Sequence, residues 1–289
     1  MSEKNGGNVP FDPEVYDALA DELRYVITDM ICRAGSGHLG GAVSLIETVV
    51  TLYYRVMDVD PDDPKSKDRD RLVLSKGHAA PVLYAVLAYK GFFPKTWLKT
   101  LNADGTKLPS HADARSVPGI DMTTGSLGQG LSTACGMALA AKKDGRRNHV
   151  FCIVGDGELN EGQNWEAAMF APQHKLDNLI AICDYNKLQI DGFTHEVIDL
   201  EPLTYKWSAF GWNVLESDGH NWDEIYNALE RGKKLHNGKP TMVIMHTTKA
   251  KKCSGVEDTP GSHNIKVADE AAHKGFLASV TSGEYKLPY

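Results

Sequence analysis

Short, continuous apolar runs alternate with segments of helical length through the second half of the chain. Buried strands are predicted at residues 149–155, 178–184, 212–216 and 241–246. Helices are predicted between them at residues 162–171, 203–210 and 222–235. Continuous apolar strands that alternate with helices are typical of parallel sheets. We therefore expect an α/β fold, with a parallel sheet covered by helices on both faces.

The first half is predicted to be mainly helical. A helix should begin after Asp12, which can cap free N–H groups, with Pro13 in its first turn. Apolar residues recur along it every three or four positions and should face the core. These are Val15, Leu19, Leu23, Val26, Ile27, Met30 and Ile31. A second helix is expected at about 44–57, then a polar loop, an apolar run at 72–75 and a helix that ends near Tyr89.

Composition and charge narrow the classes of function. Of the 289 residues, 42% are hydrophobic and 24% charged, which is enough apolar surface for a large core and excludes disorder. Lys and Arg number 31 against 38 Asp and Glu, a net charge of −7. This acidic balance argues against nucleic acid or an anionic membrane as a partner. No apolar run approaches the ~18 residues of a membrane span.

The cysteines and the first residues of the chain indicate the cellular compartment of the protein. The five cysteines form no C-x-x-C pair, so neither a disulfide framework nor a structural zinc site is expected. Residues 1–10 are polar and lack the apolar segment of a signal peptide. A cytoplasmic location fits these features best.

Polar residues stand where two predicted strands end. Residues 155–157 (Gly-Asp-Gly) close one strand, and residues 184–186 (Asp-Tyr-Asn) close the next. Because neighbouring parallel strands end at the same edge of a sheet, Asp156 and Asn186 should lie within side-chain reach. Their oxygens suit Mg²⁺, and Gly157, without a Cβ, lets backbone approach a phosphate. A lone Gly-Asp-Gly is more often a simple turn, so the second polar strand end carries the prediction.

This two-part pattern resembles the thiamine diphosphate signature, and longer segments resemble transketolase. In chain order these segments are GSGHLGG, LSKGH, TTGSLGQGL, GDGELNEGQNWEAAMFA and CDYNKLQIDG. The resemblance covers only the N-terminal, diphosphate-binding domain of that family. It implies one such domain over residues 1–289, with a core at about 12–265 and a C-terminal extension at 266–289. It also implies the N-terminal subunit of a split transketolase.

The resemblance implies thiamine diphosphate and Mg²⁺, or Ca²⁺ or Mn²⁺ in its place, as cofactors. Asp156 and Asn186 would bind the metal through side chains, and Leu188 through its backbone carbonyl. Ile190 would pack against the cofactor rings, while the family often has Pro where Ser126 stands. The cofactor-binding residues implied in this way are His78, Gly125, Ser126, Leu127, Gly157, Glu158, Asn186, Ile190 and His263.

Four histidines in polar or Gly-rich loops match family positions and are implied as catalytic residues. These are His38, His78, His111 and His263. By resemblance, His38 and His263 would handle the hydroxyl proton that moves in C–C cleavage, and His111 would bind the hydroxyl beside the donor carbonyl. His78 and His263 would contact the diphosphate. The residues that follow His111 and His263 depart from the family, which leaves substrate choice open.

The implied reaction transfers a two-carbon ketol unit from a ketose, or ketose phosphate, to an aldose. In this family the activating glutamate belongs to a pyrimidine-binding domain. The resemblance therefore implies activity only with a separate C-terminal subunit, in a heterotetramer, and Glu161 matches a carboxylate near the subunit interface. Lys249, Lys251 and Lys252 are expected in a solvated basic loop, with contact to a phosphate as the alternative.

Other functions remain as alternatives. One is a specialised transketolase-like carboligase that acts on an unusual substrate, and another is a cofactor-binding subunit without catalysis. Deoxyxylulose-phosphate synthases and dehydrogenase E1α subunits share the GDG…N pattern, but the histidines and the GELNEGQNWEA segment favour transketolase. A nucleotide-binding Rossmann protein is disfavoured because no G-x-G-x-x-G follows an early strand.

Overall fold

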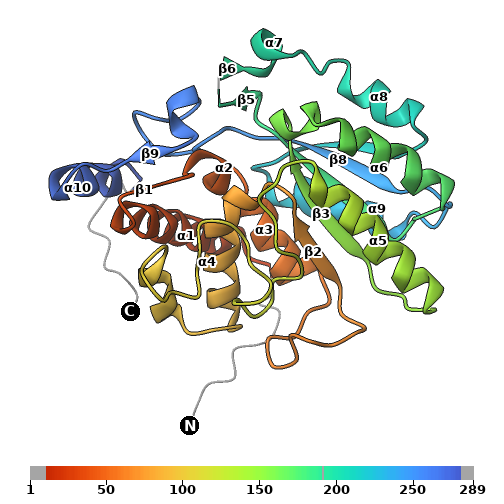
Figure 1. The fold of residues 1–289 in the computed structure, drawn as a ribbon, viewed down its shortest axis with the longest axis horizontal. Coiled ribbons are helices and arrows are strands. Elements are labelled where there is room, and N and C mark those ends of the chain that lie inside the picture. Colours follow the sequence, from red (N-terminus) through yellow and green to blue (C-terminus); the bar gives the residue numbers. More distant parts are fainter. Residues whose placement is uncertain (1–10, 191, 281–289) are drawn as a thin grey trace.

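A five-stranded parallel sheet forms the centre of the protein (Figure 1). The computed structural model describes residues 11–190 and 192–280, so the polar start and the end of the expected C-terminal extension lie outside the described residues. The strands are β2 (Arg71–Leu74), β3 (Val150–Gly155), β4 (Leu179–Tyr185), β7 (Asn213–Asp218) and β8 (Thr241–His246). Their order across the sheet is β2-β3-β4-β8-β7. The four strands predicted in the second half are confirmed, and the apolar run at 72–75 supplies the fifth.

Helices cover both faces of this sheet, as the sequence predicts. Successive strand residues alternate between two hydrophobic clusters: in β3, Phe151 and Ile153 join one, and Cys152 and Val154 the other. On the first face lie α1 (Pro13–Arg33), α3 (Ile46–Thr51), α4 (Ala80–Lys90) and α9 (Trp222–Lys234). On the second lie α5 (Gln129–Lys143), α6 (Gly162–Gln173) and α8 (Leu203–Ala209). Burial on both sides explains why the strands read as unbroken apolar runs.

Smaller elements complete the fold around the carboxyl edge of the sheet. Two antiparallel pairs are β1 (Ser36–Gly37) with β9 (Ile265–Lys266), and β5 (Leu188–Gln189) with β6 (Gly192–Phe193). Short helices are α2 (Gly40–Val43), α7 (Thr194–Val197) and α10 (Glu270–Ser279). The β1–β9 pairing joins segments from opposite ends of the sequence, next to His38 and His263. None of the helices in the described residues is both long and apolar enough to cross a membrane.

Two details of the first half differ from the prediction. Asp12 caps α1 by accepting from the N–H of Glu14 at 3.0 Å, as expected, but Val15 is 48% exposed. The neighbouring residue Tyr16 is buried in its place, and its ring packs edge-on against Trp222 with 5.4 Å between the ring centroids. The predicted helix at 44–57 is also divided: after α3 the chain forms a π-helical turn over Leu52–Val56, and apolar spacing alone does not distinguish that turn from α-helix.

Candidate active site

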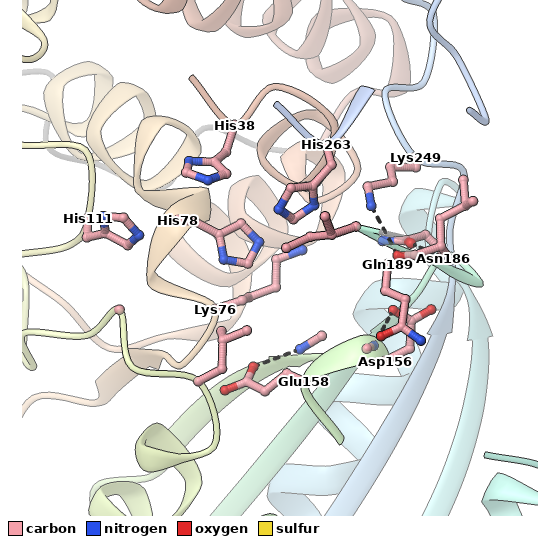
Figure 2. Close-up of a pocket in the computed structure, with 17 residues that line it drawn as sticks. His38, Lys76, His78, His111, Asp156, Glu158, Asn186, Gln189, Lys249 and His263 are labelled. Carbon is pink, nitrogen blue, oxygen red and sulfur yellow. Dashed lines mark hydrogen bonds between the residues drawn. The ribbon is translucent and has the colours of Figure 1, made fainter. Parts of the chain in front are cut away.

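A cavity of about 290 Å³ opens where β2, β3, β4 and β8 end (Figure 2). Strand ends, the loops that follow them and the segments beside β1 and β9 supply its walls. The residues predicted from the sequence for catalysis, cofactor binding and metal binding line it, with the exception of Ser126. The tertiary structure therefore brings together residues that are spread from position 38 to position 263 of the chain.

Asp156 and Asn186 follow two neighbouring strands at the carboxyl edge and line the same cavity. Asp156 follows β3 and Asn186 follows β4, and these two strands are paired in parallel up to Gly155 and Asp184. The N–H of Asp156 donates to the carbonyl of Asp184 at 3.2 Å, which ties the two strand ends together. The Asn186 amide donates from Nδ2 to Asp184 Oδ2 at 3.0 Å. Its Oδ1 accepts from the N–H of Leu188 at 3.1 Å.

The carboxyl group of Asp156 is buried, and the nearby ammonium group of Lys76 does not pair with it. Burial, reinforced by the negative charge of Asp184, raises the pKa of Asp156 to about 7. Its oxygens accept from the N–H groups of Gly157, at 2.7 Å, and Lys187. The ammonium group of Lys76, which also lines the cavity, pairs with Asp184 instead. A buried carboxylate in this setting is suited to binding a cation, because a cation stabilises its charged form.

Asp184 organises the floor beneath Asp156 and Asn186. It accepts hydrogen bonds from four side chains on four segments, namely Ser44, Lys76, Asn186 and Thr247. Burial acts to raise the pKa of Asp184, but the charge and hydrogen bond of Lys76 hold it below its ordinary value. Sequence reasoning missed Lys76. Its position directly after a strand, in the LSKGH segment, was the available signal.

Lys249 corrects the prediction of a solvated basic loop. Its side chain is buried, with 2% of the residue exposed, and Nζ donates to the carbonyl of Leu188 at 3.0 Å. Burial lowers the pKa of Lys249 to about 8. The reason is that the segment folds back on α2, where the N–H of Ala250 donates to the carbonyl of Gly40 at 3.2 Å. Lys252 is exposed, as expected, and pairs with Asp21 at the surface.

The four predicted histidines form one cluster. The His38 ring centroid lies 5.1 Å from that of His78, 5.6 Å from His111 and 5.3 Å from His263. Burial lowers the pKa of His78 to about 2 and that of His263 to about 3, and it also lowers the pKa of His38. These three rings are therefore neutral near pH 7, and each presents one N–H donor and one acceptor nitrogen. Figure 2 shows the cluster beside Lys76 and opposite Asp156.

The Gly-rich loop at 125–130 closes one side of the cavity. Gly125 has φ +151°, and a Cβ there would lie 3.2 Å from Cδ2 of His111, so this contact favours glycine. Gly125 and Leu127 line the cavity. Ser126 is the predicted cofactor-binding residue that does not line the cavity.

Glu158 supports this loop from below. It is buried, and burial raises the pKa of its carboxyl group. It accepts from the N–H of Gly128 at 2.8 Å, from the N–H of Gly155 at 3.0 Å and from the hydroxyl of Ser75. These contacts hold the loop against the end of β3. The predicted cofactor contact of Glu158 therefore stays a prediction.

Two predicted residues lie at the open side of the site. Ile190 lines the cavity yet is 65% exposed, so a large apolar side chain is left uncovered. Glu161 is exposed at the start of α6. Over residues 11–190 and 192–280, no group of three or more His, Cys, Asp or Glu side chains is arranged to hold a metal ion. The predicted site differs from such groups because it combines one carboxylate, one amide and one backbone carbonyl.

The fold and the site define a thiamine diphosphate-binding domain: the family model described as "Transketolase, thiamine diphosphate binding domain" matches residues 15–274. The chain belongs to the transketolase family of transferases. The resemblance found in the sequence is thereby confirmed, together with the predicted α/β fold.

Relatives of two lengths match this chain. It is 54% identical over 251 residues to the 6-deoxy-6-sulfo-D-fructose transketolase subunit SqwG of Clostridium sp. (strain MSTE9), a match of 87% of this chain and 91% of that protein. It is 42% identical over 267 residues to an apulose-4-phosphate transketolase subunit of Actinobacillus succinogenes, covering 92% and 96%. The crystal structure of transketolase from Campylobacter jejuni superposes with a TM-score of 0.83 at 32% identity, covering 93% of this chain and 46% of that one.

Proposed function

We propose that this chain is the cofactor-binding subunit of a two-chain transketolase that transfers a two-carbon ketol unit from a ketose to an aldose. The observation that carries the proposal is the convergence of Asp156, Asn186 and the Leu188 carbonyl with the four histidines on one cavity. Two relatives that this chain matches over most of their length are named as transketolase subunits. Longer transketolases extend well beyond it: the human protein is covered over 38% of its length.

The residues present fit Mg²⁺, or Ca²⁺ or Mn²⁺, and a diphosphate. Hard cations prefer oxygen ligands, which Asp156, Asn186 and the Leu188 carbonyl would supply. The buried charge of Asp156 favours a cation, and the Leu188 carbonyl already accepts from the ammonium of Lys249. Donors for the diphosphate would come from His78, His263 and the backbone of Gly157, with Glu158 and the 125–127 segment nearby. When bound, thiamine diphosphate supplies the nucleophilic carbon and the electron sink of ketol transfer.

The remaining work falls to side chains of this chain. His38 and His263 accept and return the proton of the hydroxyl group at the bond that breaks, which suits neutral imidazoles. His111 binds the hydroxyl beside the donor carbonyl. Ile190 covers the cofactor rings with apolar surface and thereby becomes buried itself. We assign these roles because the residues stand at positions that match the family.

The relatives' names support a partner subunit and a sugar substrate with an anionic group. A separate subunit with the pyrimidine-binding domain would supply the activating glutamate and complete a heterotetramer in the cytoplasm, and Glu161 would lie near the joint. We propose one domain for this chain over residues 1–289, consisting of the core and its C-terminal extension. Both of these relatives are named for sugars with an anionic group, a sulfonate or a phosphate. A ketose that carries such a group is therefore the proposed donor.

The proposal is tested by cofactor binding and by reconstitution. In the purified chain, Asp156→Ala and Asn186→Ala should each weaken Mg²⁺-dependent thiamine diphosphate binding at least ~10-fold by calorimetry, since each removes a metal ligand. Unchanged affinity in both variants contradicts the site. Ketol transfer should require addition of the pyrimidine-domain subunit, with 6-deoxy-6-sulfo-D-fructose, apulose 4-phosphate and fructose 6-phosphate compared as donors. Full transfer by the chain alone contradicts the two-chain assignment, and bound cofactor without transfer after reconstitution favours a non-catalytic subunit.

A further inference from the structure

Gln189 lies in the cavity wall with half of its amide unpaired. The Oε1 atom accepts from Nδ2 of Asn160 at 3.2 Å. The Nε2 atom is buried and has no hydrogen-bond partner among the described residues. The side chain rests against the backbone of Gly157, because a Cβ added to that glycine would lie 2.7 Å from Gln189 Cβ. Figure 2 shows Gln189 next to Asp156 on this wall.

An unpaired, buried N–H group is uncommon in folded proteins, because the great majority of such groups have a partner. In this structure Asn160 donates to Oε1 of Gln189, which leaves Nε2 as the free half of the amide. Asn160 ends the 3₁₀-helical turn Gly157–Asn160, so the turn that follows the strand end also sets the position of Gln189. The free donor is therefore built into the site.

The surroundings indicate an anionic acceptor. Lys249 and His263 line the same cavity and can donate hydrogen bonds to a negatively charged oxygen. The Nε2 group of Gln189 adds a further N–H donor of this kind. The backbone N–H of Gly157, which is predicted to hold the diphosphate, donates to Asp156 Oδ1 at 2.7 Å in this structure. The N–H of Gly157 is thus already used by Asp156. The Nε2 group of Gln189, which lies beside Gly157, would provide a second donor for the diphosphate.

We propose that Gln189 is a further cofactor-binding residue, whose Nε2 donates to a phosphate oxygen of the diphosphate, and that Asn160 is the positioning residue that orients its amide. The inference rests on the proposed function. It deepens that function by assigning recognition of the diphosphate group to a side chain that has no role among those implied by the family resemblance. The contact distinguishes thiamine diphosphate from thiamine, because only the former carries the acceptor.

The experiment measures binding of thiamine diphosphate and of thiamine, each with Mg²⁺, to the full chain by calorimetry. Gln189→Met keeps the length of the side chain without the donor, and should weaken thiamine diphosphate binding about 10-fold, equivalent to ~1.4 kcal/mol, with thiamine unchanged. Gln189→Glu should weaken it further, because it places an acceptor against a phosphate. Gln173→Met, at an exposed position that ends α6, is the matched control and should bind as the unmodified chain does.

Asn160 is tested by non-additivity. Asn160→Ala should weaken binding less than Gln189→Met, and the double variant should bind no more weakly than Gln189→Met alone, because both changes remove one interaction. Additive losses would overturn the positioning role. Gln189→Met or Gln189→Glu with unmodified affinity, or an equal loss for thiamine, would overturn the phosphate contact. An unmodified chain that binds neither thiamine diphosphate nor inorganic diphosphate with Mg²⁺ would overturn the proposed function itself.

Discussion

Lys76 and Asp184 form an ion pair beneath the cavity, and their side chains are 3% and 0% exposed. Lys76 follows β2, whereas Asp184 lies near the end of β4, so the pair joins two strands that β3 separates. Hydrogen bonds from Ser44 and Thr247 add two further segments to Asp184. The position of Asn186, which also bonds to Asp184, therefore depends on this ion pair.

Replacement of Lys76 by methionine should destabilise the fold strongly. Lys76→Met leaves the Asp184 carboxylate buried without its cation, which costs roughly 3–5 kcal/mol. Urea unfolding of the variant and the unmodified chain measures the difference. Lys142→Met is the control: its partial exposure, and that of its partner Asp177, limits the loss to about 1 kcal/mol. Equal losses in the two variants would contradict the structural role of the buried pair.

Two glycines of the same helix, α5, should respond to alanine in opposite directions. A Cβ at Gly130 would lie 2.3 Å from Oγ and 2.6 Å from Cα of Ser75, so Gly130→Ala should cost about 1–3 kcal/mol through overpacking. Gly136 has no heavy atom within 4 Å of such a Cβ, so Gly136→Ala should stabilise by roughly 0.5–1 kcal/mol through helix propensity. Thermal unfolding measures both, and a stabilising Gly130→Ala would contradict the close approach.

Glu47 should make stability depend on acidic pH. It accepts from Arg24 at 3.0 Å and lies 3.2 Å from Nδ1 of His220. Burial alone would raise the pKa of Glu47, but the hydrogen bond with His220 and the charge of Arg24 hold it below its ordinary value. This stabilisation is complete above the unfolded pKa of roughly 4.3 and is lost as the pH falls through the lower, folded pKa.

The pH dependence of unfolding in the Glu47→Gln variant tests this contribution. The variant should be less stable than the unmodified chain near pH 7, because Arg24 then lacks a buried anion. The difference between the two chains should narrow as the pH falls below about 4. A difference that stays constant from pH 7 to pH 3 would show that Glu47 is not responsible.

All five cysteine thiols should be unreactive in the folded protein. Each is a free, buried thiol. Burial raises the pKa of Cys32, Cys135 and Cys253 to about 12, so little thiolate forms at pH 8. A colorimetric thiol reagent should detect no thiol in native buffer and five in denaturant. Tyr205→Cys, at a position that is 76% exposed, is the positive control. Rapid native reaction of the unmodified chain would contradict the burial.

The sheet and the neighbouring strand ends that carry Asp156 and Asn186 could be predicted from local pattern alone. Strands buried on both faces must be continuously apolar, so their positions are visible in the sequence. Asp156 and Asn186 could be brought together in advance because parallel strands end at one edge. The histidines were different: spacing offered no reason to join His38 with His263, and only resemblance to a known family did so.

The burial of single polar side chains was decided by the tertiary structure. Lys249 belongs to a basic, polar segment that local composition assigns to solvent, yet the fold of that segment over α2 buries it against Leu188. The unpaired amide of Gln189 gave no local signal of its place in the cavity. The physical reason is that a side chain's burial and partners depend on which distant segments pack against it, whereas sequence periodicity records only which face of its own element it occupies.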